Sequence, residues 1–274
     1  MAEVFGSDAF SPKEIAERIE NVGVSKAHLP LLSMALLSVM AGAFIGLGAL
    51  GFVLVQSDAT LGFAAARVLG GAVFSLGLLL VVVAGAELFT GNNLLAMARA
   101  DGKLSTREVL RNWLVVLAGN LVGAVGLATL VALAHHADMN GGLIAQQYVK
   151  LAAAKCTLPV SQAFFRGILC NLLVCMAVWM AMAGRSVVDK AVALFLPVTI
   201  FVAAGFEHSV ANFYLIAMGL LLKDTVPLGT PHLDALTWPN LLVSQAPVIA
   251  GNLVGGSVLV ALVYFVIYRR GAKA

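Results

Sequence analysis

Charged side chains are scarce in this chain of 274 residues. Lysine, arginine, aspartate and glutamate together make up 11% of it, whereas an ordinary soluble domain carries about a quarter. So few charges do not cover the surface of a soluble fold of this length, and a disordered chain would be polar rather than 61% apolar. The scarcity of charge therefore predicts a single membrane-embedded body.

Cysteine and the common catalytic motifs are also sparse or missing. Cys156, Cys170 and Cys175 lack the spacing of a zinc site. There is no nucleophile elbow, phosphate loop, dinucleotide fingerprint or His-Glu-x-x-His helix. A net charge of +3 without a finger or aromatic-basic pattern does not indicate nucleic-acid binding. We expect no cofactor, no metal and no nucleic-acid partner.

What the chain has instead is long apolar stretches. A helix needs about 20 apolar residues to span a bilayer. Six stretches meet or approach this length: Leu29–Gln56, Val68–Ala98, Asn112–Ala134, Gly167–Gly184, Ala191–Leu222 and Val243–Tyr268. The second and fifth are too long for one span, and polar or small residues interrupt them at 87–92 and 207–212. The sequence thus predicts an all-α integral membrane protein with six spans over residues 29–268, the second and fifth broken.

The N-terminal segment, residues 1–28, carries several charges and no signal-peptide pattern. Ser11 precedes Pro12, and Ile15, Ile19 and Val22 follow at helical spacing. This pattern predicts a short amphipathic helix on the membrane surface. The alternative is a solvated tail.

Basic residues indicate the orientation. With the N-terminus in the cytoplasm, the N-terminal segment, the 99–111 and 185–190 loops and the tail at 269–274 hold 12 of the 17. This bias places both termini in the cytoplasm, and we expect the cytoplasmic (inner) membrane. Lys155 and Arg166 are notable because they fall on the side where basic residues are disfavoured.

A repeat is hidden in the chain. The string Gly119–Gly123, Gly-Asn-Leu-Val-Gly, recurs at Gly251–Gly255, and Glu87 and Asn92 are spaced as Glu207 and Asn212 are. Each half, about 29–136 and 155–268, holds three spans, so the second half enters the membrane from the opposite side. Inverted repeats of this kind are typical of transport proteins with a substrate path between the halves.

The two breaks are the predicted pore. Non-helical chain at membrane depth is tolerated only beside protein or a water-filled cavity. We expect Thr90 or Asn92 to cap the first new half-helix and Ser209 the second. The start of each half-helix favours an anion.

Ionisable and polar groups in this region are candidates for function. We expect His208 to face the pore, the alternative being a neutral ring bound to a backbone carbonyl. Glu87 and Glu207 are expected to hold the loops by accepting N–H bonds, although they could also line the path. Asn171 needs a partner, most simply in a break loop, and Lys155 either gathers anions at the mouth or is a solvated loop residue.

Apolar residues near the breaks are expected to form constrictions that strip hydrated ions. The candidates are Phe74, Leu78, Leu88, Phe89 and Phe201.

Four segments together resemble the formate/nitrite transporter family. They are Ala86–Asn92, Gly167–Cys175, Gly205–Asn212 and Gly251–Gly255. The resemblance covers about residues 10–268 and implies an aquaporin-like protomer, a homopentamer with one pore per subunit, and transport of a small monovalent anion. It also implies roles for eight positions.

By this resemblance, His208 is the pore histidine, Thr90 the first-loop threonine, Asn171 their hydrogen-bond partner and Lys155 the vestibule lysine. Phe74, Leu78, Leu88 and Phe201 match the constrictions. Formate is the favoured substrate, because Phe195–Asn212 resembles formate channels. Glu87 and the Ala41-Gly42-Ala43 segment are more similar to nitrite channels, so nitrite is the alternative, followed by hydrosulfide or lactate.

Two questions stay open from the sequence. Passage is either channel-like or coupled to a proton through His208. A remote alternative is an intramembrane enzyme with Ser209 or Cys156 as nucleophile, but adjacent Ser and His side chains do not readily form the required hydrogen bond. We therefore expect a transporter rather than an enzyme.

Overall fold

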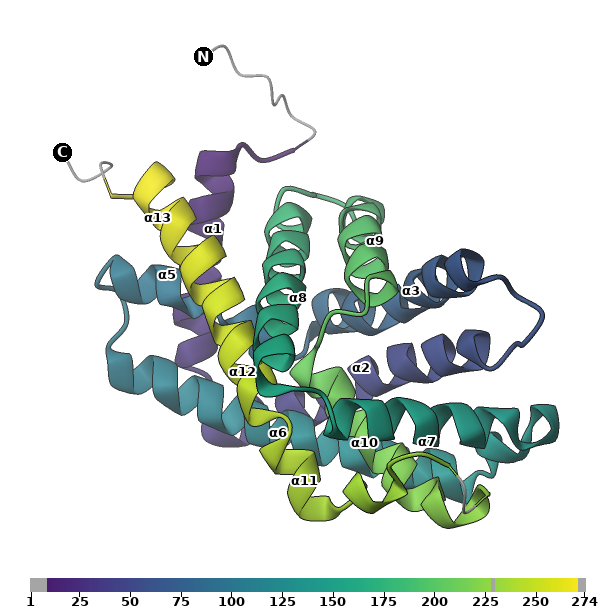
Figure 1. Cartoon of the computed structure of the whole chain (residues 1–274). Coiled ribbons are helices and arrows are strands. Elements are labelled where there is room, and N and C mark those ends of the chain that lie inside the picture. Colours follow the sequence, from purple (N-terminus) through teal and green to yellow (C-terminus); the bar gives the residue numbers. More distant parts are fainter. Residues whose placement is uncertain (1–8, 228–229, 271–274) are drawn as a thin grey trace.

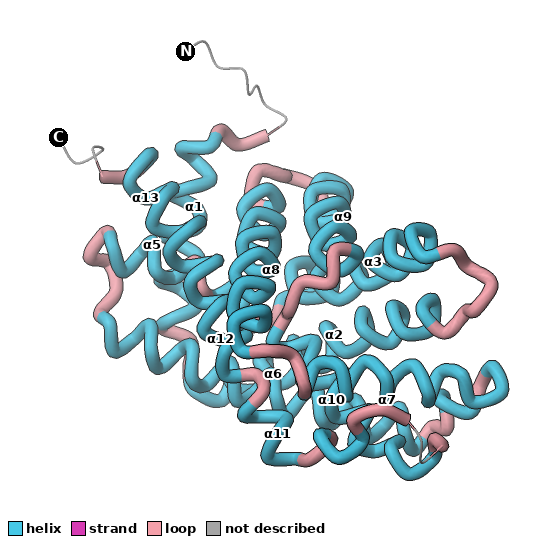
Figure 2. Tube along the Cα trace, viewed as in Figure 1, coloured by secondary structure: helices cyan, strands magenta, loops and turns pink. Residues whose placement is uncertain are grey.

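The computed structural model describes residues 9–227 and 230–270, and helices fill this part of the chain without any β-strand (Figures 1 and 2). The α-helices are α1 Pro12–Ala27, α2 Leu31–Gln56, α3 Phe63–Leu80, α4 Phe89–Asn92, α5 Leu95–Ala100, α6 Thr106–Leu133, α7 Leu143–Cys156, α8 Val160–Ala181, α9 Val187–Ala203, α10 Ser209–Leu222, α11 Trp238–Val243, α12 Ala246–Leu253 and α13 Val263–Tyr268. Two π-helical turns, Val81–Gly85 and Val254–Leu262, extend α3 and join α12 to α13.

Among the described residues, five helices are long and apolar enough to cross a membrane. They are Leu31–Gln56, Phe63–Gly85, Thr106–Leu133, Val160–Ala181 and Trp238–Tyr268. The fifth predicted span is absent from this set because it is divided into α9 and α10, as its polar interruption predicted. The third and fourth spans begin six or seven residues earlier than predicted, since polar first turns continue as helix.

The two halves have matching helix orders. In the first half, α2, α3, the α4–α5 pair and α6 follow one another, and α8, α9, α10 and α11–α13 correspond to them. Helix α2 packs on α6 as α8 packs on α12, while α3 packs on its counterpart α9. The predicted repeat is therefore present in the packing.

Glycines of the repeated string bring these helices together. A Cβ atom on Gly123 would collide with the Val39 carbonyl group, and one on Gly255 would collide with that of Ile168. Because lipid provides no hydrophobic force between helices, close backbone approach at small residues is what holds such pairs. The string thus fixes α6 on α2 and the final span on α8.

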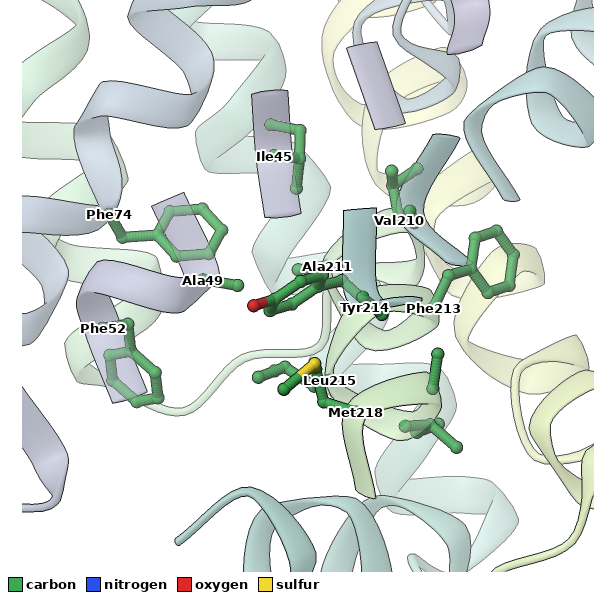
Figure 3. Packing of buried hydrophobic residues seen from close by; sticks show 14 of the residues in the cluster. Ile45, Ala49, Phe52, Phe74, Val210, Ala211, Phe213, Tyr214, Leu215 and Met218 are labelled. Carbon is green, nitrogen blue, oxygen red and sulfur yellow. The ribbon is translucent and has the colours of Figure 1, made fainter. Parts of the chain in front are cut away.

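Helix α10 lies in the middle of the bundle. Every one of its residues except Leu221 is buried, as expected for a helix surrounded by protein on all sides. Figure 3 shows Tyr214 on α10 near Ala49 and Phe74 of the first half, and the Tyr214 hydroxyl lies 2.9 Å from that of Tyr148 on α7. The start of α10 is therefore held at the centre of the molecule.

Two N-terminal predictions have different outcomes. Helix α1 begins at Pro12 after the Ser11 cap as predicted, and the backbone and hydroxyl hydrogen bonds of Ser11 lower the pKa of Glu14. Its apolar face, however, packs on the protein: Ile15 and Ile19 are buried in a cluster with Trp179. The predicted surface helix is thus docked on the bundle, and residues 1–8 of the segment and 271–274 of the tail lie outside the described residues.

Helix α7 was not predicted at all. Its 14 residues are too short for a span, and they lie in the stretch read as a connection between the two halves. The helix packs along α10 and positions Lys155 in its last turn.

Candidate functional site

Both breaks begin at a glycine that the chain needs for its backbone geometry. Gly85 and Gly205 have φ angles of 84° and 74°, a region that residues with a Cβ rarely adopt. In each case the next N–H group reaches back five residues, from Ala86 to Val81 and from Phe206 to Phe201. The two helices therefore end by the same turn.

The non-helical backbone of each break is bound by one buried asparagine. Asn120 Nδ2 donates to the Glu87 carbonyl at 2.8 Å, and its Oδ1 accepts the Phe89 N–H at 2.9 Å. In the second half, Asn252 binds the Glu207 carbonyl at 3.0 Å and the Ser209 N–H at 3.1 Å. These residues are the asparagines of the repeated Gly-Asn-Leu-Val-Gly string, whose role the sequence analysis missed although the repeat marked them.

Each break also carries a glutamate paired with a lysine. Lys26 Nζ lies 2.7 Å from Glu87 Oε1, and Lys155 Nζ lies 2.9 Å from Glu207 Oε2. The second carboxylate also accepts from Asn212 Nδ2 at 2.7 Å, as Glu87 accepts from Asn92 Nδ2 at 2.6 Å.

Two predictions are corrected by these contacts. The glutamates hold the loops, but through lysine and asparagine side chains rather than backbone N–H groups. Lys155 is a half-buried helical residue rather than a solvated loop lysine. Its first-half counterpart, Lys26, was missed because α1 was assigned to the membrane surface.

His208 is the N-cap of α10. Its Nδ1 accepts the Ala211 N–H at 3.1 Å, so in this conformation the proton of the neutral ring is on Nε2. Nε2 lies 3.0 Å from Thr90 Oγ1, which it therefore meets as a donor. The alternative of a ring bound to a backbone carbonyl is wrong, because a backbone donor occupies Nδ1.

The predicted caps are also corrected. Ser209 is the first residue of α10 rather than its cap, Thr90 lies inside α4, and Asn92 ends α4. Leu88 occupies the cap position of α4 and supplies no side-chain hydrogen bond. Histidine was not among the expected caps because Ser, Thr, Asp and Asn are the usual ones.

Asn171 finds a partner in the first break loop, as predicted, and it also contacts the asparagine that clamps the second. Its Nδ2, which carries two hydrogens, lies within hydrogen-bond distance of three acceptors: the Thr90 carbonyl at 3.2 Å, Asn93 Oδ1 at 2.7 Å and the Asn252 carbonyl at 2.7 Å. Its Oδ1 is buried and has no hydrogen-bond partner among residues 9–227 and 230–270. Asn171 thus contacts the Thr90 backbone, but among the described residues it has no hydrogen bond to His208, so only the Thr90 half of the partnership implied by the resemblance is observed.

Two cavities lie on either side of the hydrogen bonds that link Asn171, Thr90 and His208, one towards each end of α3. The α1-side cavity, about 550 Å³, is lined by α1, Leu78, Leu88 and Glu87. The α7-side cavity, about 250 Å³, is lined by Phe74, Phe201, Lys155 and His208. His208 therefore lies at the inner end of one cavity and Leu88 at the inner end of the other.

Aromatic rings close the α7-side cavity next to His208. The Phe74 and Phe201 rings meet edge to face with centroids 5.8 Å apart, and the His208 ring lies nearly parallel to Phe201 at 5.8 Å. Four of the five predicted constriction residues thus line a cavity near a break: Phe74, Leu78, Leu88 and Phe201.

The remaining predicted site residues have mixed positions. Asn92 and Asn212 line the α1-side and α7-side cavities respectively. Phe89 and Ser209 are buried and belong to the lining of neither cavity in the described structure. Phe89 is therefore placed in the core rather than at a constriction.

This arrangement defines a class of protein: a membrane-spanning bundle of inverted repeats in which two broken helices meet between two cavities. Residues 13–266 match the formate/nitrite transporter family. The chain is 38% identical over 273 residues to the formate channel FocA of Escherichia coli strain K12, covering 96% of each. The chain belongs to the formate/nitrite transporter family and is a multi-pass membrane protein.

Solved structures of similar proteins agree with this assignment. A structure described as a pentameric formate channel with formate bound is 36% identical with a TM-score of 0.79, over 87% of this chain and 97% of that one. An FNT family ion channel is 30% identical with a TM-score of 0.82, over 93% and 98%. The predicted fold class is confirmed.

Proposed function

We propose that this chain transports formate across the cytoplasmic membrane as a homopentamer. The observation that carries the proposal is His208, a titratable side chain that lies at the inner end of the α7-side cavity beside the Phe201 ring. Full-length similarity to the formate channel FocA supports formate over nitrite, and the pentameric assembly of a 36% identical formate channel supports the oligomer. Both termini are proposed to be cytoplasmic, as the distribution of basic residues favours.

The chemistry follows from the cost of moving charge. A bare anion in an apolar zone costs several kcal/mol, so the Phe74–Phe201 contact opposes free formate. Protonated His208 donates one proton to formate, the ring returns to its neutral form, and neutral formic acid passes the apolar residues. Lys155, 2.9 Å from Glu207, holds the second break beside the arriving anion.

The hydrogen bonds of His208 set a condition on this step. Since Nε2 of the neutral ring already carries a hydrogen, a second proton goes to Nδ1. Nδ1 then no longer accepts the Ala211 N–H, so protonation releases the cap of α10. Proton uptake is thereby linked to a local change at the start of this helix.

Large apolar side chains on the outer surface fit a lipid-embedded oligomer. Leu32, Leu133 and Val160 are each more than 70% exposed in the isolated chain and are three of many exposed large apolar residues. Apolar surface on this scale marks contact with lipid or with another subunit. Ser209 Oγ has no hydrogen-bond partner among the described residues, and His208 Nε2 meets the Thr90 hydroxyl as a donor rather than as a base. We therefore infer a transporter rather than an enzyme.

A flux assay tests the proposal. Proteoliposomes are loaded in turn with formate, nitrite, lactate and hydrosulfide across a pH series, and we expect formate to give the fastest flux, rising as the external pH falls. His208→Phe should abolish the proton-coupled component. A pH-dependent formate flux that is undiminished in this variant would exclude the role of His208, and faster nitrite flux would identify a nitrite channel.

A further inference from the structure

Two arginines in the α7-side cavity have no part in the network around His208. Arg67 on α3 and Arg166 on α8 both line this cavity together with Lys155. The only carboxylate in the lining is that of Glu207, and Lys155 Nζ contacts both of its oxygens, at 3.1 and 2.9 Å. Neither arginine has a carboxylate within ion-pair distance among the described residues, so the cavity holds an excess of positive charge.

The Arg67 side chain is fixed in place. Its Nε donates to the Ala203 carbonyl and its Nη2 to the Val202 carbonyl, both at 2.9 Å, at the C-terminal end of α9. The guanidinium carbon lies 5.6 Å from the centroid of the Phe52 ring. These contacts leave Nη1 without an acceptor among residues 9–227 and 230–270, so a donor of this rigid group remains available in a cavity wall.

Arg166 approaches from the other side of the break. Its carbonyl accepts the Glu207 N–H at 3.3 Å, which fixes its backbone beside the loop. Its exposed guanidinium has one hydrogen bond, from Nη2 to Gln162 Oε1 at 3.3 Å. The remaining N–H groups therefore have no protein acceptor in the described part of the chain.

We propose that Arg67 and Arg166 form an anion site at the mouth of the α7-side cavity, which binds the two-oxygen edge of a small carboxylate before it reaches His208. Guanidinium groups present planar N–H donors that match paired oxygens, whereas an ammonium group is a point charge. The site explains why two arginines lie on the face where basic residues are disfavoured. The choice of formate as the ligand of this site rests on the proposed function.

Binding is tested apart from transport by saturation-transfer NMR on the C–H proton of formate, with the purified full-length protein in detergent. We expect Arg166→Gln to raise the dissociation constant of formate at least fivefold. Arg67→Lys, which keeps the charge and loses the planar group, should raise it by a smaller factor. Lys150→Gln is the matched control, because Lys150 lies on the same side in α7 but lines a different pocket, and it should leave the constant unchanged.

Each outcome decides the inference. Unchanged formate binding in both arginine variants would overturn it, as would the absence of binding to the unaltered protein. Nitrite, which has two oxygens, should displace formate at concentrations where chloride does not, and equal displacement by chloride would also overturn it. If the unaltered protein binds formate but fails to move it in liposomes, the proposed function fails while the arginine site stands.

Discussion

The two break loops share a scaffold and differ in the residue at their centre. Both have a glycine turn, a buried asparagine clamp and a Lys–Glu–Asn cluster. The position that caps the following helix, however, is Leu88 in the first loop and His208 in the second. The scaffold therefore stabilises a break in each helix, whereas only the second break carries a titratable side chain at the cap position.

The lysines of the two clusters also differ in origin. Lys26 comes from α1, which packs on the outside of the bundle and forms a wall of the α1-side cavity. Lys155 comes from α7, which packs along the buried helix α10. The same kind of ion pair thus attaches α1 to the first break and α7 to the second, where α10 begins.

Removing the shared clamp should have the largest effect. Asn120→Leu and Asn252→Leu each leave buried backbone groups without partners, and each such group costs about 1–3 kcal/mol. We expect each variant to lose roughly 3 kcal/mol or more of unfolding free energy, measured by denaturation of the detergent-solubilised protein. Thr129→Val, on the exposed face of α6, is the control, and tolerance of the change in one half alone would show that the scaffolds are not equivalent.

Substitution of His208 separates capping from proton transfer. His208→Leu gives the second break the residue of the first, and we expect formate flux to fall by about 100-fold, equivalent to about 2.7 kcal/mol. His208→Asn supplies a good cap without a titratable group, so it should restore thermal stability but not flux. If the Asn variant transported formate normally, capping alone would be the role of His208.

The two lysines should give different transport defects. Lys155→Gln removes a charge beside His208, and we expect the KM for formate applied from the α7 side to rise roughly tenfold, about 1.4 kcal/mol. Lys26→Gln should chiefly loosen α1, seen as faster amide hydrogen exchange in residues 12–27. If the two variants changed the KM and the hydrogen exchange of residues 12–27 to the same extent, the two lysines would not have the different roles assigned to them.

The glycine turns should give the smallest change. An alanine in the left-handed region costs roughly 1–2 kcal/mol, so Gly85→Ala is expected to lower the unfolding free energy by about 1 kcal/mol. Gly205→Ala should cost more, because a Cβ there would lie 3.0 Å from Arg67 Nη2. Denaturation midpoints of the two variants measure the difference, and the reverse order would contradict the assigned packing.

The sequence was informative where a feature repeats or where polarity interrupts an apolar run. Two apolar runs too long for one span, interrupted by polar residues at 87–92 and 207–212, were enough to predict two broken spans. The partners of those residues were not predictable, since the pairing of Lys26 with Glu87 depends on where α1 docks. Helix α7 was missed because its 14 residues are too few to span the membrane, and the search for helices looked only for spans.

The central claim is that formate crosses with a proton at His208. Liposomes containing the protein and an internal pH dye are given an inward formate gradient, and labelled formate and internal pH are followed together. The account predicts about one proton taken up per formate in the unaltered protein and loss of both signals in His208→Asn. Formate entry at the normal rate without any change of internal pH would contradict it.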